Sequence, residues 1–150
     1  MIRDAIKAAQ ITAMKAGEKE RLAAVRLILA KLKDRDIELR TGTAPADDDV
    51  TVVDVLQKMV KQRRESITMY EQGGRAELAA KEQAELDVIE GVLPQQMSDA
   101  DTAAAIEGIK AEVGASSLKD MGKVMAVLKE RHGAVIDMSK VSGLVKMALG

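Results

Sequence analysis

Apolar residues recur every three or four positions along most of this chain, and that spacing is typical of one face of an α-helix. The pattern predicts seven helices, at approximately residues 2–16, 18–40, 52–72, 75–90, 99–113, 118–132 and 138–149. Residues 41–49 (TGTAPADDD) are polar, contain Gly and Pro and show no period, so they are predicted to form the one long loop. The fold class predicted from this pattern is all-α.

Side chains that accept hydrogen bonds from the first turn of a helix precede several of these segments. Three of them have an acidic residue three places later, as in a capping box: Thr51 with Asp54, Ser98 with Asp101, and Ser117 with Asp120. Asp137 is the predicted cap of the last helix. Glycines at 73, 74, 114 and 133 mark predicted helix ends, because glycine readily adopts the left-handed conformation that terminates a helix.

The helices fall into two groups separated by the segment GVLPQQMS. We expect a four-helix N-terminal domain over residues 1–93 and a small three-helix C-terminal domain over residues 94–150. The second domain is so short that it buries little surface by itself. It is therefore expected to lean on the first domain or on a partner.

Composition sets the material of the core and the overall charge. Hydrophobic residues make up 47% of the chain, but Tyr70 is the single aromatic residue, so the core must be aliphatic. The net charge of −1 gives no overall attraction to nucleic acid or to an anionic membrane. From residue 119 onward, however, six basic residues face three acidic ones, and the six are the candidate RNA-binding residues: Lys119, Lys123, Lys129, Arg131, Lys140 and Lys146.

Lys119 and Lys123 are four residues apart, so we expect them to share a face in the first turns of the sixth helix, where backbone N–H groups also favour phosphate. With so few aromatic residues, base stacking is nearly excluded. RNA contact should therefore use shape and phosphate, and should be weak and sensitive to salt. The competing interpretation is an ordinary solvated basic face.

Sequence patterns for catalysis and for cofactors are missing. The chain has no cysteine, no G-x-S-x-G elbow and no glycine-rich phosphate loop, so no catalytic residue, metal ligand or cofactor is predicted. His132 is interpreted as a solvated residue at a helix end, and Asp47, Asp48 and Asp49 as a solvated charge block rather than a metal site. No signal peptide and no apolar stretch of membrane length is evident, so a cytoplasmic location without membrane contact is expected.

Arg63 interrupts the apolar seam of the third helix. A charge in that position must be paired or must reach water. Glu82 and Glu85 border the apolar stripe of the fourth helix, so we predict that Arg63 pairs with one of them across the two helices. Such a pair is interpreted chiefly as fixing the register of the helices; a recognition site is the alternative.

Four strings together resemble a known family: KQRRES at 61–66, GRAELAAKEQAEL at 74–86, LPQQMS at 93–98 and KDMGKVM at 119–125. They are similar in order and spacing to the GatB/YqeY family, and most of all to its small stand-alone YqeY-like proteins. The resemblance implies an all-helical fold with four helices followed by three. The sequence departs from the family pattern at residues 133–137 (GAVID). A larger member of the family, the B subunit of a tRNA-dependent amidotransferase, often has a G-x-A-D-G-like turn there.

The same fold forms the tail of the B subunit of the tRNA-dependent amidotransferase, which converts Glu-tRNA(Gln) or Asp-tRNA(Asn) to the amidated form. There the tail helps to hold tRNA, and the chemistry occurs in a separate domain. The resemblance therefore implies a non-catalytic accessory protein, although the family label is carbon–nitrogen ligase with glutamine as amido-N-donor. Expected partners are tRNA and proteins of translation or of the amidotransferase; no oligomeric state is indicated.

Two other functions compete with this one. A helical protein–protein interaction module would agree with the small second domain, the near-neutral charge and nine methionines, which suit adaptable surfaces. An amidotransferase acting alone is disfavoured, because nucleophile, metal ligands and nucleotide loop are all lacking.

Overall fold

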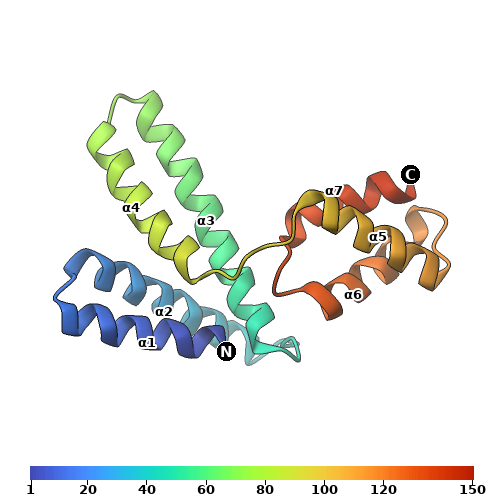
Figure 1. Cartoon of the computed structure of the whole chain (residues 1–150), viewed down its shortest axis with the longest axis horizontal. Helices are drawn as coiled ribbons and strands as arrows, with labels where there is room; N and C mark the ends of the chain where they lie inside the picture. Colours follow the sequence, from blue (N-terminus) through green and yellow to red (C-terminus); the bar gives the residue numbers. More distant parts are fainter. The chain divides into compact units, whose positions relative to one another are not determined.

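The computed structural model describes residues 1–150 and contains seven α-helices, one short 3-10 helix and no strand, so the all-α prediction is confirmed (Figure 1). The elements are α1 (Ile2–Ala16), α2 (Lys19–Leu39), α3 (Asp48–Gln72), α4 (Ala76–Val92), α5 (Asp99–Val113), η1 (Leu118–Asp120), α6 (Met121–His132) and α7 (Met138–Leu149). None of these helices is long and apolar enough to cross a membrane.

The chain divides into two compact units, each with its own core. Unit 1 is Met1–Pro94 and contains α1 to α4, and unit 2 is Gln95–Gly150 and contains the remaining elements. The division lies one residue beyond the expected boundary at 93/94. Because the sequence has almost no aromatic residues, both cores are built from Ile, Leu, Val, Ala and Met.

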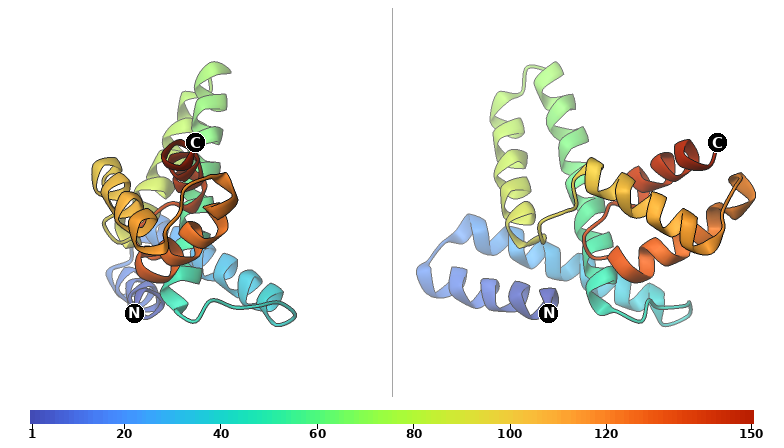
Figure 2. Two further views of the ribbon diagram at one scale, coloured as in Figure 1. Left: turned by 90° about the vertical axis from the view of Figure 1, so that its right-hand side faces the viewer. Right: turned by 45° about the vertical axis from the view of Figure 1, so that its right-hand side comes forward.

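Unit 1 combines a helix pair with a longer hairpin. Fully buried side chains of α1, α2, α3 and α4 meet in one cluster, whose largest members include Ile6, Ile28, Leu32, Leu56 and Ile89. The outer parts of α3 and α4 extend past α1 and α2, which leaves them packed only against each other (Figures 1 and 2). The hairpin turns at the predicted glycine pair, where Gly74 has a φ of 71°.

Unit 2 packs α5, α6 and α7 around a second aliphatic cluster that includes Ile106, Val124, Leu128 and Val145. Two predicted caps are confirmed. The Ser98 side chain accepts a hydrogen bond from the Asp101 backbone N–H, and the Asp137 side chain accepts one from the Ser139 N–H. As predicted, α5 ends at a left-handed glycine, Gly114, with a φ of 67°.

The predicted start of α3 is wrong. Asp47, not Thr51, is the N-cap, and its carboxylate accepts a hydrogen bond from the Asp49 N–H. Thr51 lies inside the helix and is buried. The earlier start is favoured because Asp48 and Asp49 then lie in the first turn, where negative charge is stabilised by the helix dipole. The acidic run is therefore a helix start rather than the end of a loop.

The predicted start of α6 is also wrong. Ser117 makes no capping hydrogen bond; a 3-10 turn follows it, and α6 begins only at Met121. The carboxylate of Asp120 instead accepts a hydrogen bond from the Ser116 backbone N–H, which ties this turn back onto the preceding loop. Leu118 is 54% exposed.

The guanidinium group of Arg3 joins three helices of unit 1. It donates two hydrogen bonds of 2.9 Å to Asp36 of α2, and two of 2.9 and 3.0 Å to Asp48 of α3. Beside it, the backbone N–H of Ile2 donates to Asp49 at 3.0 Å. These hydrogen bonds lower the pKa of Asp48, because they stabilise its ionised form. No local sequence pattern indicates this cluster. The contacts to Arg3 and Ile2 explain why Asp48 and Asp49 lie at the start of α3.

Replacing Arg3 with Gln should destabilise unit 1 by about 1–2 kcal/mol, because four charge-assisted hydrogen bonds are lost while solvent screens the two exposed carboxylates. The lowered pKa of Asp48 means that this stability is present above the unfolded pKa of about 4 and is lost as pH falls through the folded value. Urea unfolding at pH 7 and near pH 2 measures both effects. Equal destabilisation at the two pH values would contradict this assignment.

Candidate nucleic-acid interface

All six candidate RNA-binding residues lie in unit 2, and two of them are held in close ion pairs. Arg131 donates hydrogen bonds of 2.6 and 2.7 Å to the two oxygens of Glu112, and these bonds lower the pKa of that carboxyl group. Lys140 lies 2.8 Å from Asp99, whose hydrogen bond raises the pKa of the lysine. The positive charges of these two side chains are therefore largely compensated within unit 2.

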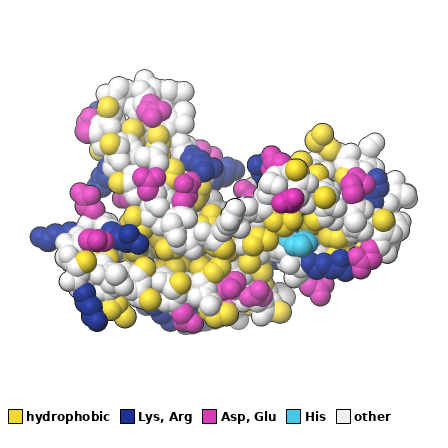
Figure 3. Space-filling view, viewed as in Figure 1, with side chains coloured by type: hydrophobic (Ala, Val, Ile, Leu, Met, Phe, Trp, Pro, Cys, Tyr) yellow, Lys and Arg dark blue, Asp and Glu magenta, His cyan; other side chains and the backbone are white.

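The other four candidates are less constrained. Lys119, Lys129 and Lys146 are exposed and make no ion pair. Lys123 lies 3.9 Å from Asp120, at the limit of an ion pair, and its side chain is 70% exposed. Basic and acidic side chains are interspersed over the face of unit 2 that is visible in Figure 3.

The six residues do not form one continuous face. Lys123 and Lys129 are six positions apart on α6, which places them about 240° apart around the helix. Lys119 lies in η1 and not in α6, so the expected placement of both lysines in the first turns of α6 is wrong. Asp120 occupies the N-cap of α6, and its negative charge opposes the phosphate binding that we expected at this helix start.

Three of the lysines nevertheless lie toward one end of unit 2. α6 and α7 pack together and run in opposite directions, so the start of α6 is near the end of α7 (Figure 1). Lys119 and Lys123 flank the start of α6, and Lys146 lies in the last turn of α7. The amino group of Lys110 also reaches this end, where it donates to the carbonyl of Ala148 at 2.9 Å. We call Lys119, Lys123 and Lys146 the lysine end of unit 2.

His132 is the last residue of α6 and is half-buried. Its backbone carbonyl accepts a hydrogen bond from the Val135 N–H, which turns the chain toward α7. No group of three or more histidine or acidic side chains in residues 1–150 is arranged to hold a metal ion. Among the surface hollows of unit 1, one of about 470 Å³ lies between α3 and α4. Two of its lining residues, Arg64 and Glu90, form an ion pair of 2.7 Å.

The Arg63 guanidinium lies between both carboxylates that the sequence offered as alternatives. Its Nε is 3.0 Å from Oε2 of Glu85, to which it donates a hydrogen bond, and 3.3 Å from Oε2 of Glu82. Oε2 of Glu82 is within ion-pair range of Arg63, but it is buried and accepts no hydrogen bond. Because the Arg63 side chain is only 14% exposed, this cluster holds the two helices of the hairpin together rather than offering a surface for recognition.

Replacing Arg63 alone with Met should destabilise the protein by about 1–3 kcal/mol, because two partly buried carboxylates lose their cation. Adding Glu82→Leu and Glu85→Leu should bring the free energy of unfolding back to within about 1 kcal/mol of the original protein, since replacing a whole buried ion cluster is often neutral. Urea denaturation measures the series. A triple variant no more stable than the single one would argue against this interpretation.

Comparison with known proteins places the chain in a family. A family model described as YqeY-like protein matches residues 3–149. Similar curated proteins are named altered inheritance of mitochondria protein 41, mitochondrial. The one from Saccharomyces cerevisiae is 32% identical over 83 residues, which are 55% of this chain and 43% of that protein. The one from Pyrenophora tritici-repentis is 28% identical over 144 residues, 92% of this chain and 75% of that protein.

The chain spans less than half the length of the Saccharomyces protein that it matches. The similarity to the Pyrenophora protein extends through both units, and so does the match to the family model. The arrangement of the helices, the four strings of sequence and these matches lead to one conclusion: the chain belongs to the YqeY-like family.

Proposed function

We propose that this protein is a non-catalytic accessory of tRNA-dependent amidation, and that it contacts tRNA through shape and phosphate groups. The resemblance to the tail of the amidotransferase B subunit suggests the partner. The observation that carries the proposal is the lysine end of unit 2, where Lys119 and Lys146 make no ion pair and Lys123 makes only a marginal one. A cytoplasmic location is part of this proposal; the curated relatives are named as mitochondrial proteins.

The chemistry of this end favours phosphate over bases. Lysine is a compact, flexible cation that attracts phosphate without reading a base sequence. The only Phe, Tyr or Trp ring is that of Tyr70, in α3 of unit 1. The one ring of unit 2, the half-buried imidazole of His132, lies at the opposite end of α6 from Lys123, so stacking cannot assist at the lysine end. With about three phosphate contacts, binding should be weak and should fall with added salt.

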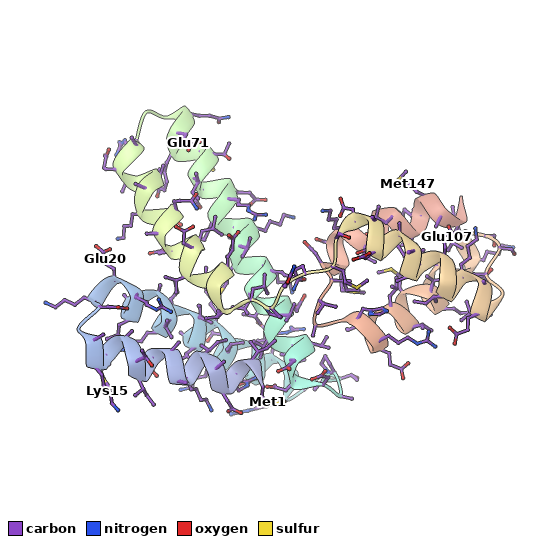
Figure 4. All side chains as sticks on the ribbon, in the orientation of Figure 1. Met1, Lys15, Glu20, Glu71, Glu107 and Met147 are labelled. Atoms are coloured by element: carbon purple, nitrogen blue, oxygen red, sulfur yellow. The ribbon has the colours of Figure 1, made fainter.

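A protein–protein interaction module is the second candidate function. It is supported by large apolar side chains that remain exposed on unit 2, namely Leu118 at 54% and Met147 at 81%. Figure 4 shows Met147 directed away from α7. Methionine adapts to partners of different shape, which suits an interaction surface.

The double substitution Lys119→Glu/Lys123→Glu should weaken binding of bulk tRNA at low salt by about tenfold or more, because two phosphate contacts become repulsive. Fluorescence anisotropy with labelled tRNA measures the affinity, and a salt titration tests its electrostatic origin. The matched control is Lys15→Glu/Lys31→Glu, which makes the same change of charge at exposed positions of unit 1. No binding by the original protein at tens of micromolar, or equal binding by the first variant, would contradict the proposal.

The purified protein should not transfer nitrogen from glutamine to a misacylated tRNA, even with ATP present, because the proposal gives it no catalytic role. Thin-layer separation of the amino acid released from the tRNA measures the conversion. A complete amidotransferase serves as the positive control. Formation of amidated aminoacyl-tRNA by this chain alone would refute the non-catalytic role.

A further inference from the structure

α2 presents a row of four basic residues on the side opposite the core of unit 1. Lys19, Arg26, Lys33 and Arg40 follow one another at intervals of seven residues, the last of them at the C-cap. Seven residues are close to two helical turns, so the four lie almost in line and drift by only about 20° at each step. The row extends over about 31 Å of helix. We call these four residues the basic row of α2.

The basic row is not neutralised within the protein. All four side chains are exposed, and none of them makes an ion pair. Other basic residues of the same helix do form ion pairs; Arg35, for example, lies 2.8 Å from Glu38. The helical positions of Glu20, Asp34 and Glu38 turn them away from the row, and Asp36 is bound to Arg3. The row is therefore a line of like charges without internal compensation.

Aliphatic side chains alternate with these cations on the same face. Leu22 and Leu29 are half-buried there and Ile37 is 47% exposed. Leu22 and Leu29 lie between the basic row and the core, since they are three or four positions from Val25 and Leu32, and Leu29 packs against the core cluster. Ile37 lies on the outer side, beside Lys33 and Arg40. The outer face of α2 thus combines regularly spaced positive charge with a margin of aliphatic side chains, of which Ile37 is the most exposed.

This combination discriminates among possible partners. A helix that lies on a membrane carries its cations and its apolar residues on different faces, whereas here they share one face and the opposite face is occupied by the core. A nucleic acid backbone would engage the cations but would offer nothing to Leu22, Leu29 and Ile37, which are not aromatic and cannot stack on bases. An amphipathic helix with acidic residues at seven-residue intervals and aliphatic residues between them would satisfy both kinds of side chain.

We infer that the outer face of α2 is a docking surface for an acidic amphipathic helix of a partner protein, aligned along the basic row. The seven-residue interval matches the repeat by which two helices pack side by side over several turns. Opposite charges along the row set the alignment and speed the encounter. The apolar side chains between them exclude water from the centre of the contact. This surface belongs to unit 1 and is independent of the lysine end of unit 2.

The test uses the full chain and a labelled synthetic peptide of about 28 residues. Its four Glu, at seven-residue intervals, span about 31 Å, the length of the row, and a Leu follows three residues after each Glu. A second peptide has the same composition in scrambled order. Fluorescence anisotropy at low salt should show binding of the periodic peptide at least about tenfold tighter than binding of the scrambled one.

Two variants separate the charged and the apolar parts of the surface. Arg26→Glu/Lys33→Glu should weaken binding of the periodic peptide by about tenfold or more, and this loss should shrink as salt is added. Ile37→Asn should weaken binding by a factor that salt leaves unchanged. Lys15→Glu/Lys31→Glu is the charge-matched control outside the row and should bind within about twofold of the original protein. Circular dichroism confirms that each variant is folded.

Three results would overturn the inference: no preference for the periodic peptide, equal binding after reversal of Arg26 and Lys33, or loss of tRNA binding in that variant with peptide binding unchanged. The last result would assign the row to RNA. The Lys119→Glu/Lys123→Glu variant should bind the peptide normally, so failure of the tRNA proposal is distinguishable from failure of this one.

Discussion

Aliphatic burial is the interaction on which both units of this protein depend. With Tyr70 as the only aromatic residue, no large flat side chain bridges a gap between helices. The cores are instead filled by Ile, Leu and Val side chains of similar size, such as Ile28 and Leu56 in unit 1 and Ile106 and Leu128 in unit 2. Charged side chains complete the packing at the margins, where Arg3 joins three helices and Arg63 joins two.

The sequence predicted the helices well because an aliphatic core leaves a regular trace at a period of 3.6 residues. It was less successful at helix starts. Thr51 and Ser117 are chemically suitable caps, but Asp47 is the cap that brings Asp48 within reach of Arg3, and a contact between residues 45 positions apart leaves no local pattern. Ser98 and Asp137 were predicted correctly because each directly precedes its helix without such a competing contact.

The charged residues show the same difference between features that leave a local sequence pattern and features that depend on distant contacts. Arg63 could be recognised because it breaks an apolar seam, and its two possible partners bordered the facing stripe. The six candidate cations at the C-terminal end were chosen by counting charges, and counting cannot show that Arg131 and Lys140 are already engaged by Glu112 and Asp99. The basic row of α2 was detectable from its seven-residue interval, but it is hidden when charge is summed over residues 1–97, which contain 16 basic and 17 acidic residues.

The hairpin of α3 and α4 has a dynamic consequence. Its outer part is covered by no third helix, so few buried groups hold it apart from the cluster around Arg63. A segment of this kind can fray from its turn at Gly73 and Gly74 while the aliphatic centre of unit 1 stays intact, since regions with low contact density open at a lower free energy than the whole fold. Amide protons near Met69 should therefore be replaced by deuterium through local opening, and those near Leu56 only through global unfolding. Protection of amide protons from exchange should therefore decrease along α3, from the core of unit 1 toward the turn of the hairpin.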